Sequence, residues 1–514
     1  MPPPRISVPT ARQPAQTAQP AQRAHRALLA VCAAFVVLPA LLVPLSLPLG
    51  WDEIVYAGRF ASYAQGLDVP FEAPRTRGVP VLMAPVALWS DDVVLLRAWL
   101  GLLAGVALYA GYVPWLRVLR ARPSVVPLAA AGYASLWFTL FYAGSAMPNH
   151  YTAMGATAGV GWFLRHPGTW ARRGEPLRAS AGLACGLGLA TLTRPNDAAW
   201  IAAPLVLAAL AHRPWRRAAP LAALTAGVLA GGVPWLVESE LRFGGVRERL
   251  ALATDQQGGV RLQFNLPAVL NALDGPLLCR PCAPAAPNLP TALWWYALPV
   301  LVAAGVWLVL RGPDRGAPDR AAPNPGDPDR GGPDRGGPDA LPVAAVVLPV
   351  LVAGSASVTY LFLLDYSAAR FLLTPYALLA LPAALAVRAL WGAARRHGRV
   401  AVGLLGLVLA GQLAVQLAVA HGHADIQAEA RADWHRITAV LREAGVGRGC
   451  VLDGNSMVIP VAYTAGCFPA AQRPGRPPDA WVLRRAEPPS TPGELRVIPV
   501  PGTYNAGWRV AIPR

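Results

Sequence analysis

The apolar run "ALLAVCAAFVVLPALLVPLSL" (27–47) is followed at once by the stretch "PLGWDEIVYAGRF" (48–60). As a helix, the first of these is long enough to cross about 30 Å of hydrocarbon. The second places two adjacent carboxylates, Asp52 and Glu53, where a chain leaving a bilayer first meets water. The sequence therefore predicts a membrane span with an acidic motif at its exit.

The composition of the whole chain is that of a multi-span membrane protein. Its 514 residues are 54% hydrophobic and only 14% charged, with a mean hydropathy of +0.38, whereas soluble domains contain about 25% charged residues. The apolar runs lack the alternation of barrel strands, so we expect a polytopic α-helical membrane protein. About eleven spans are predicted, over residues 27–49, 93–115, 124–142, 150–164, 179–193, 197–211, 219–237, 292–310, 341–361, 371–389 and 400–420.

Arginine clusters predict the orientation of these spans. The segments 116–122, 165–178, 213–218 and 388–399 are arginine-rich and fall on one side, which the positive-inside rule assigns to the cytoplasm. We expect a plasma-membrane protein with its N-terminus inside and its C-terminus outside. The predicted outer segments are 50–92, 143–149, 238–291 and the chain after 421.

The segment 179–211 is difficult, because 33 residues are too many for one span and few for two. We predict two short spans that turn at "TRPND" (193–197), which keeps both basic flanks in the cytoplasm. A single span over 179–211 would place every later segment on the opposite side of the membrane.

Two segments are predicted to be unstructured, one before the membrane domain (27–420) and one within it. The Pro/Gln/Ala-rich N-terminus (1–26) is expected to be disordered in the cytoplasm, and the repeat of the form x-P-D-R-G within 312–340 to be a flexible cytoplasmic linker. The final segment (421–514) combines a helical pattern over 424–445 with short strand patterns at 450–453, 480–485, 494–500 and 508–513. It is predicted to be a small extracytoplasmic α/β domain.

The cysteines agree with this map. Cys32 and Cys185 lie within predicted spans, and the other four lie on the predicted outer side, where disulfides persist. The expected pairs are Cys279–Cys282 and Cys450–Cys467. A redox or metal-binding role for "CRPC" (279–282) is the alternative, but the helix context of a thioredoxin-type motif is missing.

Charged and polar side chains gather at the outer ends of the spans, where ionisable groups usually have a function. The candidate catalytic residues are Asp52 and Glu53. The candidate substrate-binding residues are Arg59, Arg75, Arg77, Asn149, His150, Arg194, Asp197, Asp365 and Arg370. Simpler roles are open for several of them: Asp52 as a helix cap, Arg59 as a headgroup anchor, His150 as a satisfied hydrogen-bonding residue, Arg194 as a cap of the broken helix, and Arg370 with Asp365 as a structural ion pair.

This combination of residue types favours phosphate and hydroxyl chemistry. Planar guanidinium groups bind phosphate well, and a carboxylate beside them suits a hydroxyl that must lose a proton. A lipid-phosphate-linked sugar is an activated donor available outside the cell. Because phosphate is a good leaving group, one base and cationic stabilisation suffice, whereas a glycosidase usually needs two carboxylates.

Three stretches, "WDEIVYAGRF" (51–60), "LTRPNDAAWIAAP" (192–204) and "SAARFLLTPYALLALP" (367–382), resemble the GT-C superfamily of polyprenyl-phosphate-sugar-dependent glycosyltransferases. That superfamily includes protein O-mannosyltransferases and the bacterial aminoarabinose lipid A transferase. The resemblance covers about residues 27–420 and implies an inverting sugar transfer to an extracytoplasmic hydroxyl. It implies Asp52 as the general base, with Glu53 supporting it or binding a metal. No cofactor is identified by the residues themselves, and a divalent cation, Mg²⁺ or Mn²⁺, is the candidate.

Two departures limit the resemblance. The family's "PPL" stretch is replaced by "PRTRGVPVLMAP" (74–85), and the second outer loop reads "MPNH" (147–150) where the family often has another acid. A metal site shared between two acidic loops therefore does not follow from the resemblance.

The expected partners are a polyprenyl-phosphate-linked sugar, membrane lipids and a lipid, glycan or protein acceptor. No nucleic acid is expected, because the net charge of +17 comes from inner arginine clusters without interleaved aromatics. One rival function is a transporter or lipid-glycan flippase, which would show repeated halves and ionisable residues near the midplane. Another is a non-enzymatic envelope scaffold. Which sugar is moved, the identity of the acceptor and the oligomeric state are open.

Overall fold

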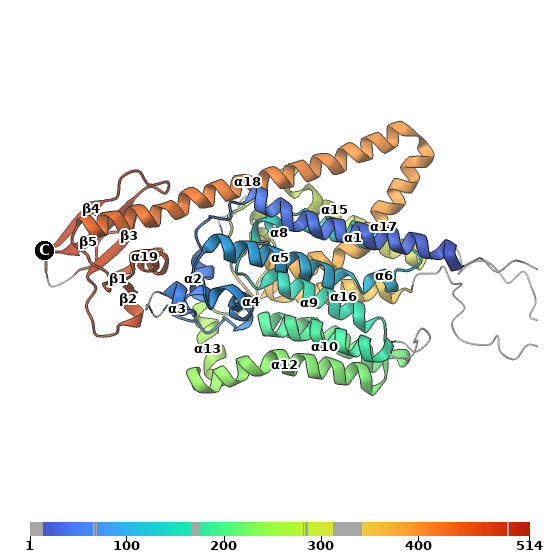
Figure 1. The fold of residues 1–514 in the computed structure, drawn as a ribbon, viewed down its shortest axis with the longest axis horizontal. Coiled ribbons are helices and arrows are strands. Elements are labelled where there is room, and N and C mark those ends of the chain that lie inside the picture. The colour runs from blue at the N-terminus through green and yellow to red at the C-terminus, as the bar shows by residue number, and fades with distance from the viewer. Residues whose placement is uncertain are drawn as a thin grey trace, which may run out of the picture.

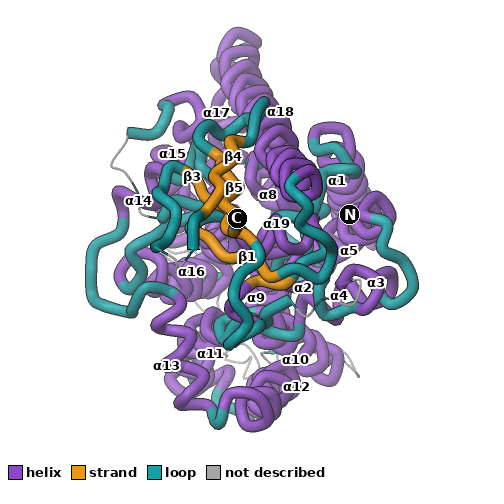
Figure 2. Tube along the Cα trace, turned by 90° about the vertical axis from the view of Figure 1, so that its left-hand side faces the viewer, coloured by secondary structure: helices purple, strands orange, loops and turns teal. Residues whose placement is uncertain are grey.

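The computed structural model of this chain is an elongated bundle of helices with a small β-sheet domain at one end (Figure 1). It describes residues 14–64, 67, 69–166, 175–280, 282, 286–311, 342–490 and 493–514. The predicted linker (312–340) lies outside these residues. Figure 2, viewed from the end that carries the sheet, shows the strands lying over the helix bundle.

In the first half of the chain, the described residues form helices and no strands, with short helices between long ones. Its helices are α1 (Pro14–Leu42), α2 (Trp51–Ala57), α3 (Ala61–Ala64), α4 (Gly78–Ala87), α5 (Val93–Tyr112), α6 (Trp115–Val118), α7 (Val125–Ala134), α8 (Trp137–Tyr142), α9 (Asn149–Phe163), α10 (Glu175–Thr193), α11 (Pro195–Ala211) and α12 (Ala218–Phe243).

The second half continues the bundle and ends in the sheet domain. It contains α13 (Val246–Gln256), α14 (Leu266–Asn271), α15 (Leu289–Leu310), α16 (Ala344–Phe362), α17 (Leu373–His397), α18 (Arg399–Glu443), α19 (Val458–Ala465) and the strands β1 (Val451–Gly454), β2 (Phe468–Pro469), β3 (Ala480–Arg484), β4 (Leu495–Pro499) and β5 (Trp508–Pro513).

Within the described part of the chain, seven helical segments are long and apolar enough to cross a membrane. They are Gln19–Leu42, Val93–Val118, Ala218–Phe243, Leu289–Leu310, Ala344–Phe362, Ala369–His397 and Arg399–Glu443. This is a multi-pass membrane protein. Shorter apolar helices such as α7 and α11 account for further predicted spans, so the total of about eleven stays a prediction.

The predicted turn at "TRPND" separates two helices. Arg194 has a non-helical backbone (φ −151°, ψ 86°), and α11 begins at Pro195, whose fixed φ and missing N–H suit a first helical position. The preceding helix, α10, therefore ends at Thr193. A polar break between two adjacent helices results.

Three sequence-based expectations are wrong in detail. The predicted span 124–142 is broken at Leu136, which is extended, after the Ser135 hydroxyl donates back to the Gly132 carbonyl (3.1 Å). The N-terminus is helical from Pro14 rather than disordered to residue 26, because Ala and Gln continue the helix of the apolar run. The predicted helices 400–420 and 424–445 are one helix, α18, because no proline interrupts them.

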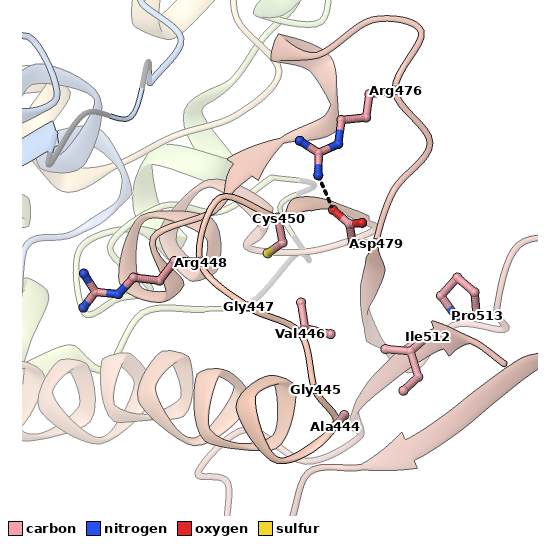
Figure 3. Close-up of a pocket in the computed structure, with 10 residues that line it drawn as sticks. All are labelled: Ala444, Gly445, Val446, Gly447, Arg448, Cys450, Arg476, Asp479, Ile512 and Pro513. Atoms are coloured by element: carbon pink, nitrogen blue, oxygen red, sulfur yellow. Dashed lines mark hydrogen bonds and ion pairs between the residues drawn. The ribbon is translucent and has the colours of Figure 1, made fainter.

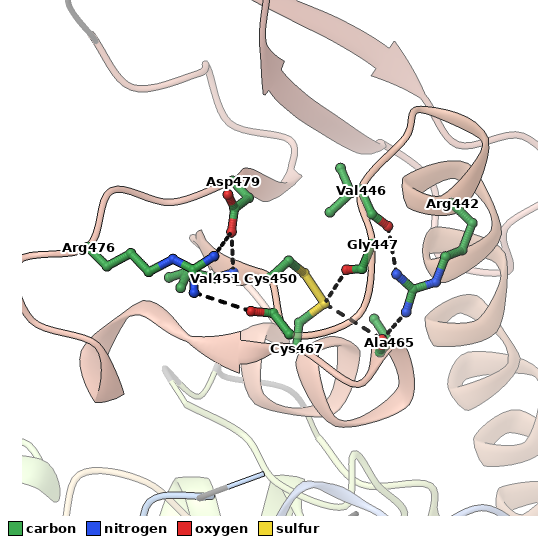
Figure 4. Close-up of a disulfide and its surroundings, with 10 residues drawn as sticks. Arg442, Val446, Gly447, Cys450, Val451, Ala465, Cys467, Arg476 and Asp479 are labelled. Atoms are coloured by element: carbon green, nitrogen blue, oxygen red, sulfur yellow. Dashed lines mark hydrogen bonds and ion pairs between the residues drawn. A yellow bond between two sulfur atoms is a disulfide. The ribbon is translucent and has the colours of Figure 1, made fainter. Parts of the chain in front are cut away.

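The C-terminal sheet has the strand order β2-β1-β3-β5-β4. Strands β1, β2 and β3 are parallel, whereas β5 runs antiparallel to both β3 and β4. The disulfide Cys450–Cys467 joins the residues just before β1 and β2 (Figure 4). Arg442, at the end of α18, donates to the carbonyls of Val446 and Ala465 beside it.

A hydrophobic core packs this domain against one end of the helix bundle. Ile54 and Val55 of α2 belong to the same buried cluster as Ile437 of α18, Val461 of α19 and Val482 of β3. The acidic motif on α2 is therefore placed between the membrane helices and the sheet domain.

Candidate active site

Asp52 lies in the first turn of α2 and is held between two arginines from distant parts of the chain. Its Oδ1 accepts from Arg75 Nη2 at 2.8 Å, and its Oδ2 accepts from Arg370 Nη2 at 3.0 Å. The Asp52 side chain is 30% exposed, whereas those of Arg75 and Arg370 are 12% and 9% exposed. An accessible carboxylate with two nearly buried guanidinium groups results.

Each arginine is oriented by further contacts. Arg75 donates from Nε to Glu72 (3.0 Å) and lies over the Tyr56 ring (5.2 Å). Its backbone carbonyl accepts from the fully buried Arg249 (2.7 Å). These contacts fix the loop before α4 and leave one edge of the Arg75 guanidinium directed at Asp52.

Arg370 lies near the end of the segment "LDYSAARF" (364–371), and its guanidinium is also held on the side away from Asp52. Its Nη1 donates to the Tyr142 hydroxyl and to the Leu277 carbonyl, both at 2.9 Å. The backbones of Cys279 and Ser367 pair with each other, and the disulfide Cys279–Cys282 closes the loop next to this pair. Both cysteine pairs expected from the sequence are thus joined in the structure.

Arg194 adds a third guanidinium beside this pair. It forms an ion pair with Asp197 (3.1 Å) and lies over the rings of Tyr360 (5.5 Å) and Phe371 (5.7 Å). Asp197 also accepts from the Tyr360 hydroxyl at 2.7 Å. Arg370 lies over the same Phe371 ring (5.4 Å), so the break between α10 and α11 lies beside the same site.

The electrostatics favour an ionised Asp52. Burial by itself would raise the pKa of this carboxyl, but Arg75 and Arg370, with a smaller contribution from Arg194, lower the pKa below its usual value. Asp52 therefore carries a negative charge at neutral pH.

Glu53 has a different environment from its neighbour. It is 3% exposed and accepts from both terminal nitrogens of Arg97 (3.1 Å each), from the Gly50 and Ala146 backbone N–H groups (2.8 and 3.0 Å) and from Arg431 (3.4 Å). With both oxygens occupied in this way, Glu53 holds the start of α2 in place. The expectation that it acts in catalysis or binds a metal is not supported by this position.

The remaining predicted residues are dispersed. Arg77 pairs with Glu238 of α12 (2.5 Å), and Arg59 lies over the Phe71 ring (5.5 Å). His150 contacts the Tyr133 hydroxyl and the Ala104 carbonyl, both at 3.0 Å, inside the bundle. Asn149 is buried beside it, and Asp365 is 40% exposed with Arg261 at 4.0 Å. Within the described part of the chain, the ion pairs of Asp52 are with Arg75 and Arg370, which are not among these five.

A resident divalent cation does not fit the acidic motif as it is arranged. Among the described residues, no three His, Cys, Asp or Glu side chains are grouped closely enough to hold a metal ion. Asp52 and Glu53 each pair with two guanidinium groups, whereas Mg²⁺ prefers oxygen ligands free to approach in octahedral geometry. The expected Mg²⁺ or Mn²⁺ stays an untested prediction.

Sequence reasoning missed the residues that orient the site. Tyr56, Tyr142 and Arg249 contact the arginines beside Asp52, and Arg97 and Arg431 hold Glu53. An arginine within an apolar run, such as Arg97 in "VVLLRAWLGLL" (93–103), is costly unless it is paired. The position of Arg97 in an apolar run could therefore have indicated that it has a buried partner. The local sequence around the other four residues contains no such indication.

The C-terminal domain contains a separate hollow of about 310 Å³ (Figure 3). Its wall includes Arg476, which pairs with Asp479 at 3.2 Å, and the side chain of Ile512. All of its lining residues come from 444–513, so it belongs to the sheet domain and not to the Asp52 cluster.

The similarity of this chain to known proteins is found in its structure and not in its sequence. No protein-family model and no curated protein matches the sequence. The crystal structure of ArnT from Cupriavidus metallidurans bound to undecaprenyl phosphate aligns with 94% of this chain and 97% of its own, at 13% identity and a TM-score of 0.62. The chain has the GT-C fold. The apo state of ArnT aligns over the same shares at 13% identity and a TM-score of 0.58.

The GT-C fold inferred from three short motifs is thereby confirmed. ArnT is an aminoarabinose lipid A transferase. Since the alignment extends over 94% of this chain, the shared architecture includes the C-terminal domain as well as the membrane bundle. Within this GT-C fold, Asp52 lies on the first short helix after α1, between the bundle and the sheet.

Proposed function

We propose that this chain is a membrane glycosyltransferase that moves a sugar from a polyprenyl-phosphate donor to a hydroxyl group outside the cytoplasm, with inversion and with Asp52 as general base. The observation that carries the proposal is the carboxylate of Asp52, 30% exposed, between the nearly buried guanidinium groups of Arg75 and Arg370. The GT-C fold supports it.

The donor phosphate matches the arginines. Arg75, Arg194 and Arg370 offer guanidinium groups around one site, and such groups bind phosphate oxygens through paired hydrogen bonds. In the absence of donor, Arg75 and Arg370 are occupied by Asp52. A bound phosphate competes for them, which loosens their hold on Asp52 and raises its pKa. Donor binding thus converts a weakly basic carboxylate into a better proton acceptor.

The chemical step is one displacement at the anomeric carbon. The acceptor oxygen forms a bond to that carbon while its proton passes to the Asp52 carboxylate. The bond from carbon to phosphate oxygen breaks, and its electron pair leaves with the lipid phosphate, whose charge the arginines stabilise. No general acid is needed, and a single displacement inverts the configuration. No step uses a metal ion.

The proposed setting is the plasma membrane, with about eleven spans, the N-terminus inside, and the Asp52 site and C-terminal domain outside. The disulfide Cys450–Cys467 supports an oxidising location for that domain. The sheet domain, packed against α2, is proposed to recognise or cover the acceptor, which is a lipid, glycan or protein hydroxyl.

The test is release of free lipid phosphate from synthetic polyprenyl-phosphate sugars by purified protein. We expect Asp52→Asn to lose activity by about 10²- to 10⁴-fold, because it removes the proton acceptor. The matched control is Asp91→Asn, an exposed carboxylate of the same outer segment, which should keep full activity.

Full activity of Asp52→Asn would exclude Asp52 as the base but leave the transferase in place. If the wild type released nothing across a broad panel of donors and acceptors, the transferase proposal would be wrong. A transporter or flippase of lipid-linked glycan would then be favoured.

A further inference from the structure

Helix α18 contacts the segment that carries Asp52 and a segment that contacts Arg370. Arg431 on α18 is 8% exposed in its side chain and donates from Nη1 to the Pro48 carbonyl and, at 3.4 Å, to Glu53. Two turns earlier on the same helix, His423 contacts the Asp274 carbonyl at 3.0 Å and stacks on Trp137 at 4.3 Å. Arg431 thus contacts the segment around α2, and His423 contacts the segment before Leu277.

The first contact fixes the segment that carries Asp52. Pro48 lies just before α2, and Glu53 also accepts from the Gly50 backbone N–H, so Arg431 and Glu53 together clamp the first turn of the helix. Asp52 is the residue before Glu53, in that same turn. Any loosening of this clamp lets Asp52 move away from Arg75 and Arg370.

The second contact supports the segment that holds Arg370. Asp274 precedes by three residues Leu277, whose carbonyl accepts from Arg370. Trp137 also donates to the Leu273 carbonyl at 2.6 Å. Helix α18 therefore carries one support for the loop that orients Arg370 and another for the helix that bears Asp52.

The outer end of α18 is fixed into the sheet domain. Asp433 is fully buried and accepts from the Tyr504 and Asn505 backbone N–H groups at 2.8 and 2.9 Å and from Trp508 Nε1 at 3.3 Å. These donors lie in the turn before β5 and at its start. Asp433 and Arg431, two residues apart on a helix, point in nearly opposite directions. One continuous helix thus joins the sheet to the acidic motif.

We propose that Arg431 is a positioning residue that sets the geometry of Asp52 from the C-terminal domain. This inference rests on the proposed function for its consequence, since it assigns Asp52 the reacting role. Arg431 touches no substrate in this account; it acts through Glu53 and Pro48, and its effect is on the distances from Asp52 to Arg75 and Arg370.

The first test compares Arg431→Gln with Glu429→Gln, an exposed residue of the same helix whose ion pair among the described residues is with Arg436. Arg97 still pairs with Glu53 in Arg431→Gln, so we expect the variant to fold. We expect kcat to fall by about 10- to 100-fold, as for a displacement of about 1 Å, with KM for the donor unchanged. The acid limb of the kcat/KM profile, which reports the free enzyme, should move to higher pH, because Asp52 then lies further from Arg75 and Arg370. Arg431→Lys should restore part of kcat.

The second test reads the same geometry without catalysis. In a chain with Cys32→Ala and Cys185→Ala, the rate at which Asp52→Cys is alkylated is measured against pH. We expect the arginines to hold the pKa of this thiol below the ordinary value of about 8.5, and Arg431→Gln to raise it towards that value. Glu429→Gln should leave it unchanged.

The outcomes separate the two proposals. A wild type without transferase activity overturns the proposed function, while the alkylation series still decides the position of residue 52. Equal kcat per folded molecule and equal thiol titration in Arg431→Gln and Glu429→Gln overturn the positioning role, whatever the reaction is.

Discussion

At the scale of residues, two neighbouring acids have different tasks. Asp52 and Glu53 are consecutive on a helix, so their side chains point about 100° apart. Asp52 turns towards Arg75 and Arg370 at an accessible edge, whereas Glu53 turns inward to Arg97 and Arg431. The position of the pair "DE" directly after the first span was sufficient to predict both residues as catalytic candidates. Which acid is accessible depends on groups that lie far away in the sequence.

Removing one arginine beside Asp52 should change the pH dependence of the reaction. Burial raises the pKa of Asp52, while Arg75 is the first of the charges that lower it. Without Arg75 the pKa of Asp52 rises, so Asp52 becomes protonated at a higher pH. Because the base must be ionised, activity then begins to fall at a higher pH than in the wild type. We expect the acid limb of kcat/KM for Arg75→Gln to move upward, measured by lipid-phosphate release from pH 3 to 8.

Arg77→Gln is the matched control for this experiment. Arg77 lies two residues further on, but its guanidinium pairs with Glu238 of α12. Its acid limb should remain that of the wild type. A common shift in both variants would show that the loop, and not the charge of Arg75, controls Asp52.

At the scale of elements, the bundle is held by close helix contacts that need glycine. A Cβ at Gly231 of α12 would lie 2.3 Å from the Gly188 carbonyl oxygen on α10, and a Cβ at Gly186 would lie 2.7 Å from the Gly155 carbonyl oxygen on α9. Small residues at such places let membrane helices approach closely. Helices α10 and α12 thereby lie in direct backbone contact.

Two adjacent glycines of α12 allow a matched measurement. Gly231→Ala forces a clash with backbone, whereas at Gly232 the nearest atom to a new Cβ is the Thr191 methyl at 3.6 Å, an ordinary contact. We expect Gly231→Ala to lower the free energy of unfolding by about 1–3 kcal/mol. Gly232→Ala should be neutral or slightly stabilising. Thermal unfolding in detergent measures both, and equal stabilities would contradict the close packing.

At the scale of the whole molecule, orientation is the property that the proposed function needs most. Labelling of introduced cysteines can determine the orientation. Residue 53 is buried and therefore unsuited to labelling. Leu262 in the segment after α13 is 85% exposed, and Arg396 at the end of α17 is also exposed. In a chain with Cys185→Ala, an impermeant maleimide should label Leu262→Cys on intact cells. It should label Arg396→Cys only after permeabilisation. The reverse pattern would place Asp52 inside and exclude the proposed enzyme.

Much of the architecture was predictable from sequence because it depends on local patterns. The turn at "TRPND", four of the five strands and the helical nature of the bundle were all expected, since proline, alternation and apolar run length act over a few residues. The break at Leu136 and the continuity of α18 were not, because neither has a proline or a clear change of composition to mark it. The short strand β2 has only two residues and was missed for the same reason.

Composition and the order of residues were sufficient to predict a multi-pass membrane protein of the GT-C fold with an acidic motif after its first span. The lengths of apolar runs and the short motifs are local features of the sequence, and they indicate the membrane spans and the fold. The partners of Asp52 could not be read in this way. Arg75 and Arg370 are 23 and 318 residues away from it, and only the packing of α2 against the bundle and the sheet domain brings them within 3.0 Å. Three-dimensional structure also separated Asp52 from Glu53, because burial and pairing of charges depend on neighbours in space.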